Sequence, residues 1–78
     1  MSVPRFATAT GFGNQVPLSF AVRQIVPRDV KVSYGPGIDP AALLDWKGGQ
    51  PWNRTLAAAI RPLGLEMVMT YMAVEIRK

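Results

Sequence analysis

Two short helix–strand units, each opened by the same local pattern, most constrain how this chain can fold. In each unit a proline is followed by a large apolar residue and then by Ser19 or Asn53. Serine and asparagine are favoured N-caps, because their side-chain oxygens accept hydrogen bonds from the first-turn amides. The pattern therefore predicts helices that begin at Ser19 and Asn53, each with the preceding apolar residue packed back over the first turn as a staple.

Proline and glycine also mark where both helices end. Pro27 follows the first predicted helix, and Pro62 and Gly64 follow the second, since neither residue type continues a helix comfortably. Helices of two to three turns are marginal in isolation. Both are therefore predicted to pack on a sheet through their apolar stripes.

The segments after the helices have the alternation of strands. Val30–Tyr34 places apolar and polar residues on opposite faces, which predicts a half-buried strand. Leu43–Lys47 alternates in the same way after a turn at Asp39–Ala41, although Asp39-Pro40 also suits the start of a short helix. Leu65–Ile76 is interpreted as two strands with a tight turn near Tyr71-Met72, and a single long or bulged strand is the alternative.

The first residues are small and polar. Met1–Pro4 is predicted to be a mobile tail and Arg5–Thr10 a short first strand, with Gly11-Phe12-Gly13 as a loop. We accordingly divide the chain into residues 1–10, the tail and first strand, and residues 11–78, a single domain. The predicted fold class is α+β, with two helices packed on a small mixed β-sheet in the order β-α-β-β-α-β-β.

Composition argues against an enzyme. The 78 residues include no cysteine and no histidine, so Ser-His and Cys-His nucleophile pairs and the commonest metal ligands are missing from the sequence. The five acidic residues are scattered singly. We expect no catalytic residue, no cofactor, no metal and no small-molecule ligand.

The net charge of +4 leaves a second interpretation open. Arg23, Arg28, Arg54 and Arg61 fall on the predicted outer sides of the helices or just beyond them. A small basic α+β domain that binds nucleic acid is therefore the alternative function. Against it, the aromatic residues do not interleave with basic ones as they do in single-strand binding platforms.

A family resemblance rests on five stretches of sequence. They are Val16-Pro17-Leu18-Ser19-Phe20-Ala21-Val22-Arg23-Gln24-Ile25, Val30-Lys31-Val32-Ser33-Tyr34, Gly49-Gln50-Pro51-Trp52 leading into Leu56-Ala57-Ala58-Ala59-Ile60, Leu63-Gly64-Leu65, and Val74-Glu75-Ile76. Together they resemble the short amino-terminal domain of secretins and TonB-dependent receptors. They are also similar to the related carboxy-terminal domain of the toxin-coregulated pilus biosynthesis protein Q family. The first helix departs from the family pattern at Val22, where leucine is usual, and the last hairpin lacks the usual turn residues.

The resemblance implies a non-enzymatic module of a trans-envelope machine, such as a type IV pilus or a secretion system with an outer-membrane secretin. It implies a periplasmic location, contacts with other subunits of the complex, and a ring homo-oligomer in the full-length protein. No direct membrane insertion is expected, since no apolar run reaches the length of a membrane span. The chain opens with no signal-peptide pattern.

The candidate contact residues are those that we expect to be exposed or to lie at the edge of a sheet. Phe20 lies opposite the apolar stripe of its helix, and Trp46 adjoins a glycine pair, so each is a candidate interface anchor. Core packing is the alternative for both residues. Val74, Glu75 and Ile76 belong to the terminal segment Val68–Ile76, which we expect on or near a sheet edge, where another chain can pair with it.

Overall fold

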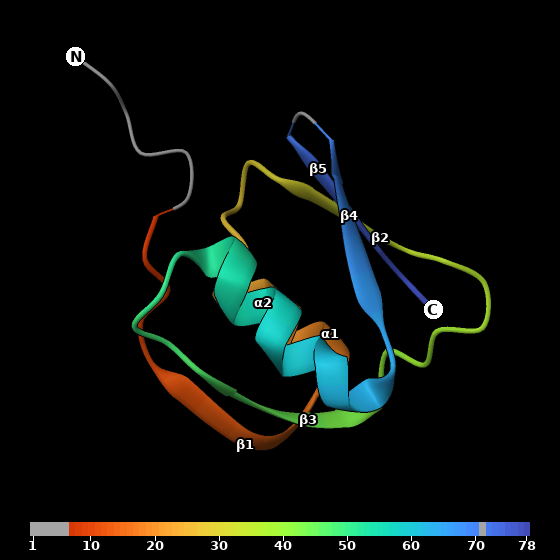
Figure 1. The fold of residues 1–78 in the computed structure, drawn as a ribbon, viewed down its shortest axis with the longest axis horizontal. Coiled ribbons are helices and arrows are strands. Elements are labelled where there is room, and N and C mark those ends of the chain that lie inside the picture. Colours follow the sequence, from red (N-terminus) through yellow and green to blue (C-terminus); the bar gives the residue numbers. More distant parts are fainter. Residues whose placement is uncertain (1–6, 71) are drawn as a thin grey trace.

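The computed structural model describes residues 7–70 and 72–78, and this part of the chain forms an α+β fold (Figure 1). Its element order, β-α-β-β-α-β-β, confirms the predicted order. The elements are the strands β1 (Phe12–Pro17), β2 (Lys31–Tyr34), β3 (Leu43–Lys47), β4 (Glu66–Thr70) and β5 (Ala73–Arg77), the helices α1 (Leu18–Ile25) and α2 (Trp52–Ile60), and the 3-10 turn η1 (Arg61–Leu63).

The strands form two small sheets, and the helices lie between them (Figure 1). β1 pairs with β3 in an antiparallel sheet of two strands. The second sheet has the order β2-β5-β4, with β2 parallel and β4 antiparallel to β5. This second sheet is the mixed one that the sequence predicted, whereas the separate β1–β3 pair was not foreseen.

The buried apolar side chains form one core between the two sheets. α1 and α2 contribute their predicted stripes, and β3 and β5 contribute alternate residues from opposite sides of the helices. The least exposed large side chains, each below 2% exposure, are Leu18, Leu56, Ile60, Val74 and Ile76. One continuous core explains why helices of eight and nine residues are stable here.

α1 begins one residue before the predicted cap, at Leu18. The Leu18 amide donates to the Ala42 carbonyl at 2.8 Å, and the Ser19 amide donates to the Pro40 carbonyl at 2.9 Å. The prediction of Ser19 as N-cap is wrong, because Pro17 occupies that position and no side chain caps the helix. Backbone carbonyls from the chain before β3 take the place of the side-chain cap.

α2 repeats the same arrangement. It begins at Trp52, with Pro51 in the N-cap position, and the Trp52 amide donates to the Ala7 carbonyl at 2.9 Å. Asn53 is therefore the second helical residue and not the cap. Its side-chain oxygen is buried and has no hydrogen-bond partner among the described residues. Trp52 itself is 2% exposed, so it is a core residue, and it is the first residue of the helix and not the residue before the cap.

The first strand lies later than predicted. β1 covers Phe12–Pro17, whereas among the described residues of the predicted Arg5–Thr10, which are 7–10, only Thr8 forms a bridge, with Pro51. Met1–Pro4, Arg5 and Phe6 lie outside the described residues. The Ala9 amide donates to the Gln50 carbonyl at 2.9 Å, and Ala9 is 7% exposed, so the packed unit includes residues before 11.

The last two strands form the predicted hairpin. β4 and β5 pair from Glu66 opposite Arg77 to Thr70 opposite Ala73, which excludes the single long strand. Met72 has a positive φ of 60°, so a methionine occupies a backbone conformation that glycine or asparagine usually adopts in such turns. The length of the predicted Leu65–Ile76 segment therefore indicated a turn, whereas the residue types in the turn did not.

Candidate functional site

The candidate anchors Phe20 and Trp46 differ in exposure. Phe20 on α1 is 50% exposed, as expected for a residue opposite the apolar stripe. Trp46 on β3 is 6% exposed and belongs to the core. A Cβ atom added at Gly13 would lie 2.5 Å from Nε1 of Trp46, so the indole lies directly over this glycine of the partner strand. Trp46 therefore fills space inside the β1–β3 side of the molecule.

The candidate edge strand is in the middle of its sheet. β5 pairs with β2 on one side and β4 on the other, so Val74–Ile76 does not lie at an edge, whereas β4, which holds Val68, is an edge strand of the same sheet. Val74 and Ile76 are 1% and 0% exposed, and both side chains enter the core. Glu75 is half-buried on the opposite face, between Val68 and Ser33 of the neighbouring strands. Local alternation predicted the strand, but only the sheet order shows which strand has an open edge.

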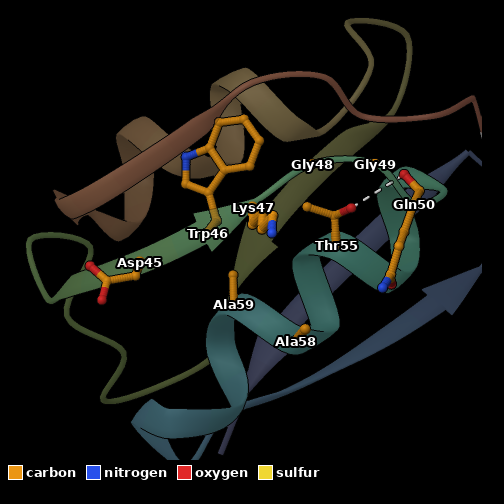
Figure 2. Close-up of a pocket in the computed structure, with 9 residues that line it drawn as sticks. All are labelled: Asp45, Trp46, Lys47, Gly48, Gly49, Gln50, Thr55, Ala58 and Ala59. Carbon is orange, nitrogen blue, oxygen red and sulfur yellow. Dashed lines mark hydrogen bonds between the residues drawn. The ribbon is translucent and has the colours of Figure 1, made fainter.

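A hollow of about 370 Å³ lies between β3 and α2 (Figure 2). Its walls are the backbone around Gly48 and Gly49 and the small side chains of α2, and Trp46 points away from α2. The Thr55 hydroxyl donates to the Gln50 carbonyl at 3.3 Å across one end. Asp45 and Lys47, which also line the hollow, have opposite charges. No single charge type is favoured here.

Asp45 has a structural role beside this hollow. Its Oδ1 accepts the Gln15 amide at 2.7 Å and the Gln15 side-chain nitrogen at 3.2 Å. Gln15 has a positive φ of 52° and lies where the register of β1 shifts between Gly13 and Val16. The carboxylate thus holds a β-bulge in place. The sequence analysis missed this pairing, because thirty positions separate the two residues.

A larger groove of about 570 Å³ lies between α1 and β2. One wall comes from the last turn of α1 and the chain that follows it, and the other comes from alternate residues at 30, 32 and 34. The lining residues are Val22, Arg23, Val26, Pro27, Arg28, Val30, Val32 and Tyr34. Valine predominates, and two arginines are the only charged groups in this lining. We call this surface the α1–β2 groove.

The α1–β2 groove combines valine side chains with two arginines, and more of its accessible lining is polar than apolar. Arg23 and Arg28 are exposed, so their guanidinium groups are available to a partner. Tyr34 is 37% exposed, and burial raises the pKa of its hydroxyl above the usual value of 10.0. Such a surface suits side chains that are apolar or negatively charged.

The β2 backbone adds an open strand edge beside this groove. The Lys31 amide donates to the Met72 carbonyl at 3.0 Å, and the Gly35 amide donates to the Ile76 carbonyl at 2.8 Å. In a parallel ladder alternate residues bond to the same neighbour, so Ser33 also faces β5. The N–H and C=O groups of Val32 and Tyr34 therefore point away from β5. No described strand pairs with β2 on that side.

The four arginines on which the nucleic-acid interpretation depends do not all line the same groove. Arg23 and Arg28 belong to the α1–β2 groove, whereas Arg54 lies on α2 and Arg61 begins η1. All four are exposed. The sequence indicated their exposure, but it did not indicate that two of them border an apolar groove.

The described residues contain no cluster of three or more acidic, histidine or cysteine side chains that could hold a metal ion. Across the same described ranges, no helix has both the length and the hydropathy needed to cross a bilayer.

Comparison with protein-family models, with curated proteins and with solved structures gives no match. The resemblance to the secretin amino-terminal domain and the pilus protein Q family therefore stays a prediction from the quoted residues. The fold and the α1–β2 groove are the structural observations on which a functional proposal rests.

Proposed function

We propose that the chain is a non-enzymatic protein–protein interaction module of a trans-envelope machine, acting in the periplasm as an assembly adaptor. The machine is of the type IV pilus or secretin class, and the partners are other subunits of that complex. The observation that carries the proposal is the element order. Four of the five stretches that carry the resemblance fall on β1–α1, β2, α2 and β5, and Leu63-Gly64-Leu65 falls on the link from η1 to β4, within an element order of β-α-β-β-α-β-β.

The surface chemistry also supports an interaction module. Phe12, Phe20 and Leu43 are exposed by 72%, 50% and 51%, so these large apolar side chains are accessible to a partner. An open strand edge at β2 adds backbone groups that can pair with another chain. Polar chemistry is sparse by comparison, and the single salt bridge given by the described residues joins Arg77 and Glu66 on the sheet surface.

Site-specific photocrosslinking in the organism that encodes the chain tests the proposal. Benzoylphenylalanine is placed at the exposed positions of Phe12, Phe20, Tyr34 and Arg54 in the full gene product. Adducts are identified by mass spectrometry after cell fractionation. We expect adducts with envelope proteins of a pilus or secretion complex, recovered from the periplasmic or membrane fraction. Adducts confined to cytosolic proteins or to nucleic acid would overturn the proposal.

A further inference from the structure

We propose that the α1–β2 groove binds an extended, acidic segment of a partner protein, which adds to the open edge of β2 as a further strand. This inference rests on the proposed interaction function, and it names the surface and the chemistry of the partner. Three independent features of the groove support this inference. They are a regular strand edge, an apolar wall and a margin that carries two arginines.

The strand edge supplies backbone pairing. Val32 and Tyr34 turn two amides and two carbonyls away from β5, spaced two residues apart as a ladder requires. β2 itself has no register shift against β5. An incoming strand of four or five residues, at about 3.3 Å per residue, matches its length.

The apolar wall supplies a place for alternate side chains of that strand. An added strand continues the sheet, so one of its faces turns toward the helices, as the inner face of β5 does. There it meets the half-buried Pro27, Val30 and Val32, whereas Val22 and Val26 also line the groove but are only 3% and 8% exposed. Valine, isoleucine or leucine at alternate positions of the partner fits this wall.

The charges in the groove lining favour a negatively charged partner. Arg23 and Arg28 line the α1–β2 groove, and no carboxylate does. Asp29 is exposed next to Arg28 but lies outside the lining. The whole chain has a net charge of +4. An aspartate or glutamate in the incoming segment is attracted to these two guanidinium groups, whereas a lysine is repelled by them.

Two other occupants fit the groove less well. A single-stranded nucleic acid needs aromatic faces for its bases, and Tyr34 is the one aromatic residue in the lining. A second copy that paired β2 with β2 would bring both sets of Arg23, Arg28 and Lys31 together, and like charges across such a pair are destabilising. Both occupants are outcomes that the experiment can detect.

Amide-detected NMR on the ¹⁵N-labelled 78-residue chain provides the first test. The probes are acetylated, amidated peptides of about eight residues, in which valine or isoleucine alternates with threonine and two positions carry glutamate. Matched peptides carry lysine in place of glutamate. We expect shifts centred on Val22, Arg23 and residues 30–35, and about tenfold weaker binding of the lysine peptides at low salt. Equal binding of both series, shifts elsewhere, or no shifts with any peptide would overturn the inference.

Backbone pairing is tested on the peptide, so that the protein stays unchanged. Two versions of the best peptide are N-methylated at alternate amides, one version at the odd positions and the other at the even positions. Only one edge of a strand faces β2, so one version should lose binding and the other should keep it. Equal loss in both versions contradicts strand addition.

The charge selection is tested by reversal. In an Arg23→Glu, Arg28→Glu variant the preference should invert, with lysine peptides binding more tightly than glutamate peptides. The matched control is Arg54→Glu, Arg61→Glu, which changes the net charge equally but lies outside the groove lining. Retained dispersion of the amide spectrum verifies folding. A similar loss in both double variants would show that only net charge matters, and it would overturn the groove assignment.

Photocrosslinking in cells separates this inference from the proposed function. Adducts of an envelope protein at Tyr34 but not at Arg54, mapped to an acidic extended segment, support both. Envelope-protein adducts only at Phe12, Phe20 or Arg54 leave the proposed function standing and overturn the groove inference. Self-adducts or nucleic-acid adducts at Tyr34 also overturn the inference. If none of these positions captures a protein, the proposed function itself fails.

Discussion

The two sheets of this molecule are built in different ways. In the β1–β3 sheet the strands are irregular, and their register shifts at Gln15, where Asp45 accepts the backbone amide. In the β2-β5-β4 sheet the ladders have no register shift, and the buried side chains of Val74 and Ile76 attach the sheet to the helices. Bulges bend a strand and discourage pairing along it, whereas a regular edge invites pairing. The comparison favours the three-stranded sheet, whose edge strands are β2 and β4, and the two arginines of the α1–β2 groove are the reason that we propose docking at β2.

The largest expected loss of stability comes from a substitution in the irregular β1–β3 sheet. Gly13→Ala places a Cβ 2.5 Å from Nε1 and 2.9 Å from Cδ1 of Trp46, which is 6% exposed and has little room to move. We expect a loss of about 2–3 kcal/mol in the free energy of unfolding, measured by urea denaturation.

Gly64→Ala is the matched control for this substitution. Gly64 has a φ of 74° and no atom within 4 Å of an added Cβ, so only backbone strain is introduced. We expect a cost of about 1 kcal/mol. If both variants lose the same amount, close packing of Trp46 on β1 is not what holds this sheet.

The second prediction concerns the polar contact of the bulge. Asp45→Ala removes the acceptor of the Gln15 amide and should lower the free energy of unfolding by about 1 kcal/mol. Asp45→Asn keeps a side-chain oxygen at the same place and should cost clearly less. Equal losses in thermal or urea denaturation would contradict a specific role for the acceptor.

A smaller effect distinguishes the two non-glycine residues with positive φ in the described part of the chain, Gln15 in the β1–β3 sheet and Met72 in the β4–β5 turn. Met72→Gly relieves a φ of 60° in the β4–β5 turn and should stabilise the chain by about 0.5 kcal/mol. Gln15→Gly relieves a similar strain but also removes the side-chain donor to Asp45. We therefore expect a smaller gain from it or none, and a larger gain at Gln15 than at Met72 would contradict the contrast between the sheets.

The smallest predicted effect is a pH dependence at the open edge. Burial raises the pKa of the Tyr34 hydroxyl above 10.0, so the folded chain favours the neutral phenol. The stability that this contributes is present below pH 10 and is lost as the pH rises through the folded pKa. Denaturation of the chain and of its Tyr34→Phe variant between pH 8 and about 11.5 should diverge only above pH 10. A constant difference across this range would contradict a partly desolvated hydroxyl.

Local sequence patterns predicted most of the elements because their causes are local. Alternation predicted strands over Val30–Tyr34 and Leu43–Lys47, of which the first begins one residue later, at Lys31, and proline and glycine located the ends of both helices. The caps were predicted incorrectly at Ser19 and Asn53, because the first-turn amides bond to backbone carbonyls from distant segments. No side-chain pattern encodes such a tertiary contact.

The candidate site was predicted less completely than the fold. Phe20 is exposed as expected, but Trp46, Val74 and Ile76 are buried. Their placement depends on the order of strands in the sheets, which pairs β5 on both sides and leaves β2 and β4 at the edges. The α1–β2 groove joins residues whose alternation and charge were visible separately, and only the parallel pairing of β2 with β5 brings them to one open edge.

Amide hydrogen exchange of residues 31–35 tests the open edge most directly. In the chain alone, the amides of Lys31, Ser33 and Gly35 should exchange slowly, because they bond to β5. Val32 and Tyr34 should exchange much faster and should slow when the acidic peptide is bound. If Val32 and Tyr34 were as protected as Ser33 without any partner, β2 would have no open edge, and the account of this surface would be wrong.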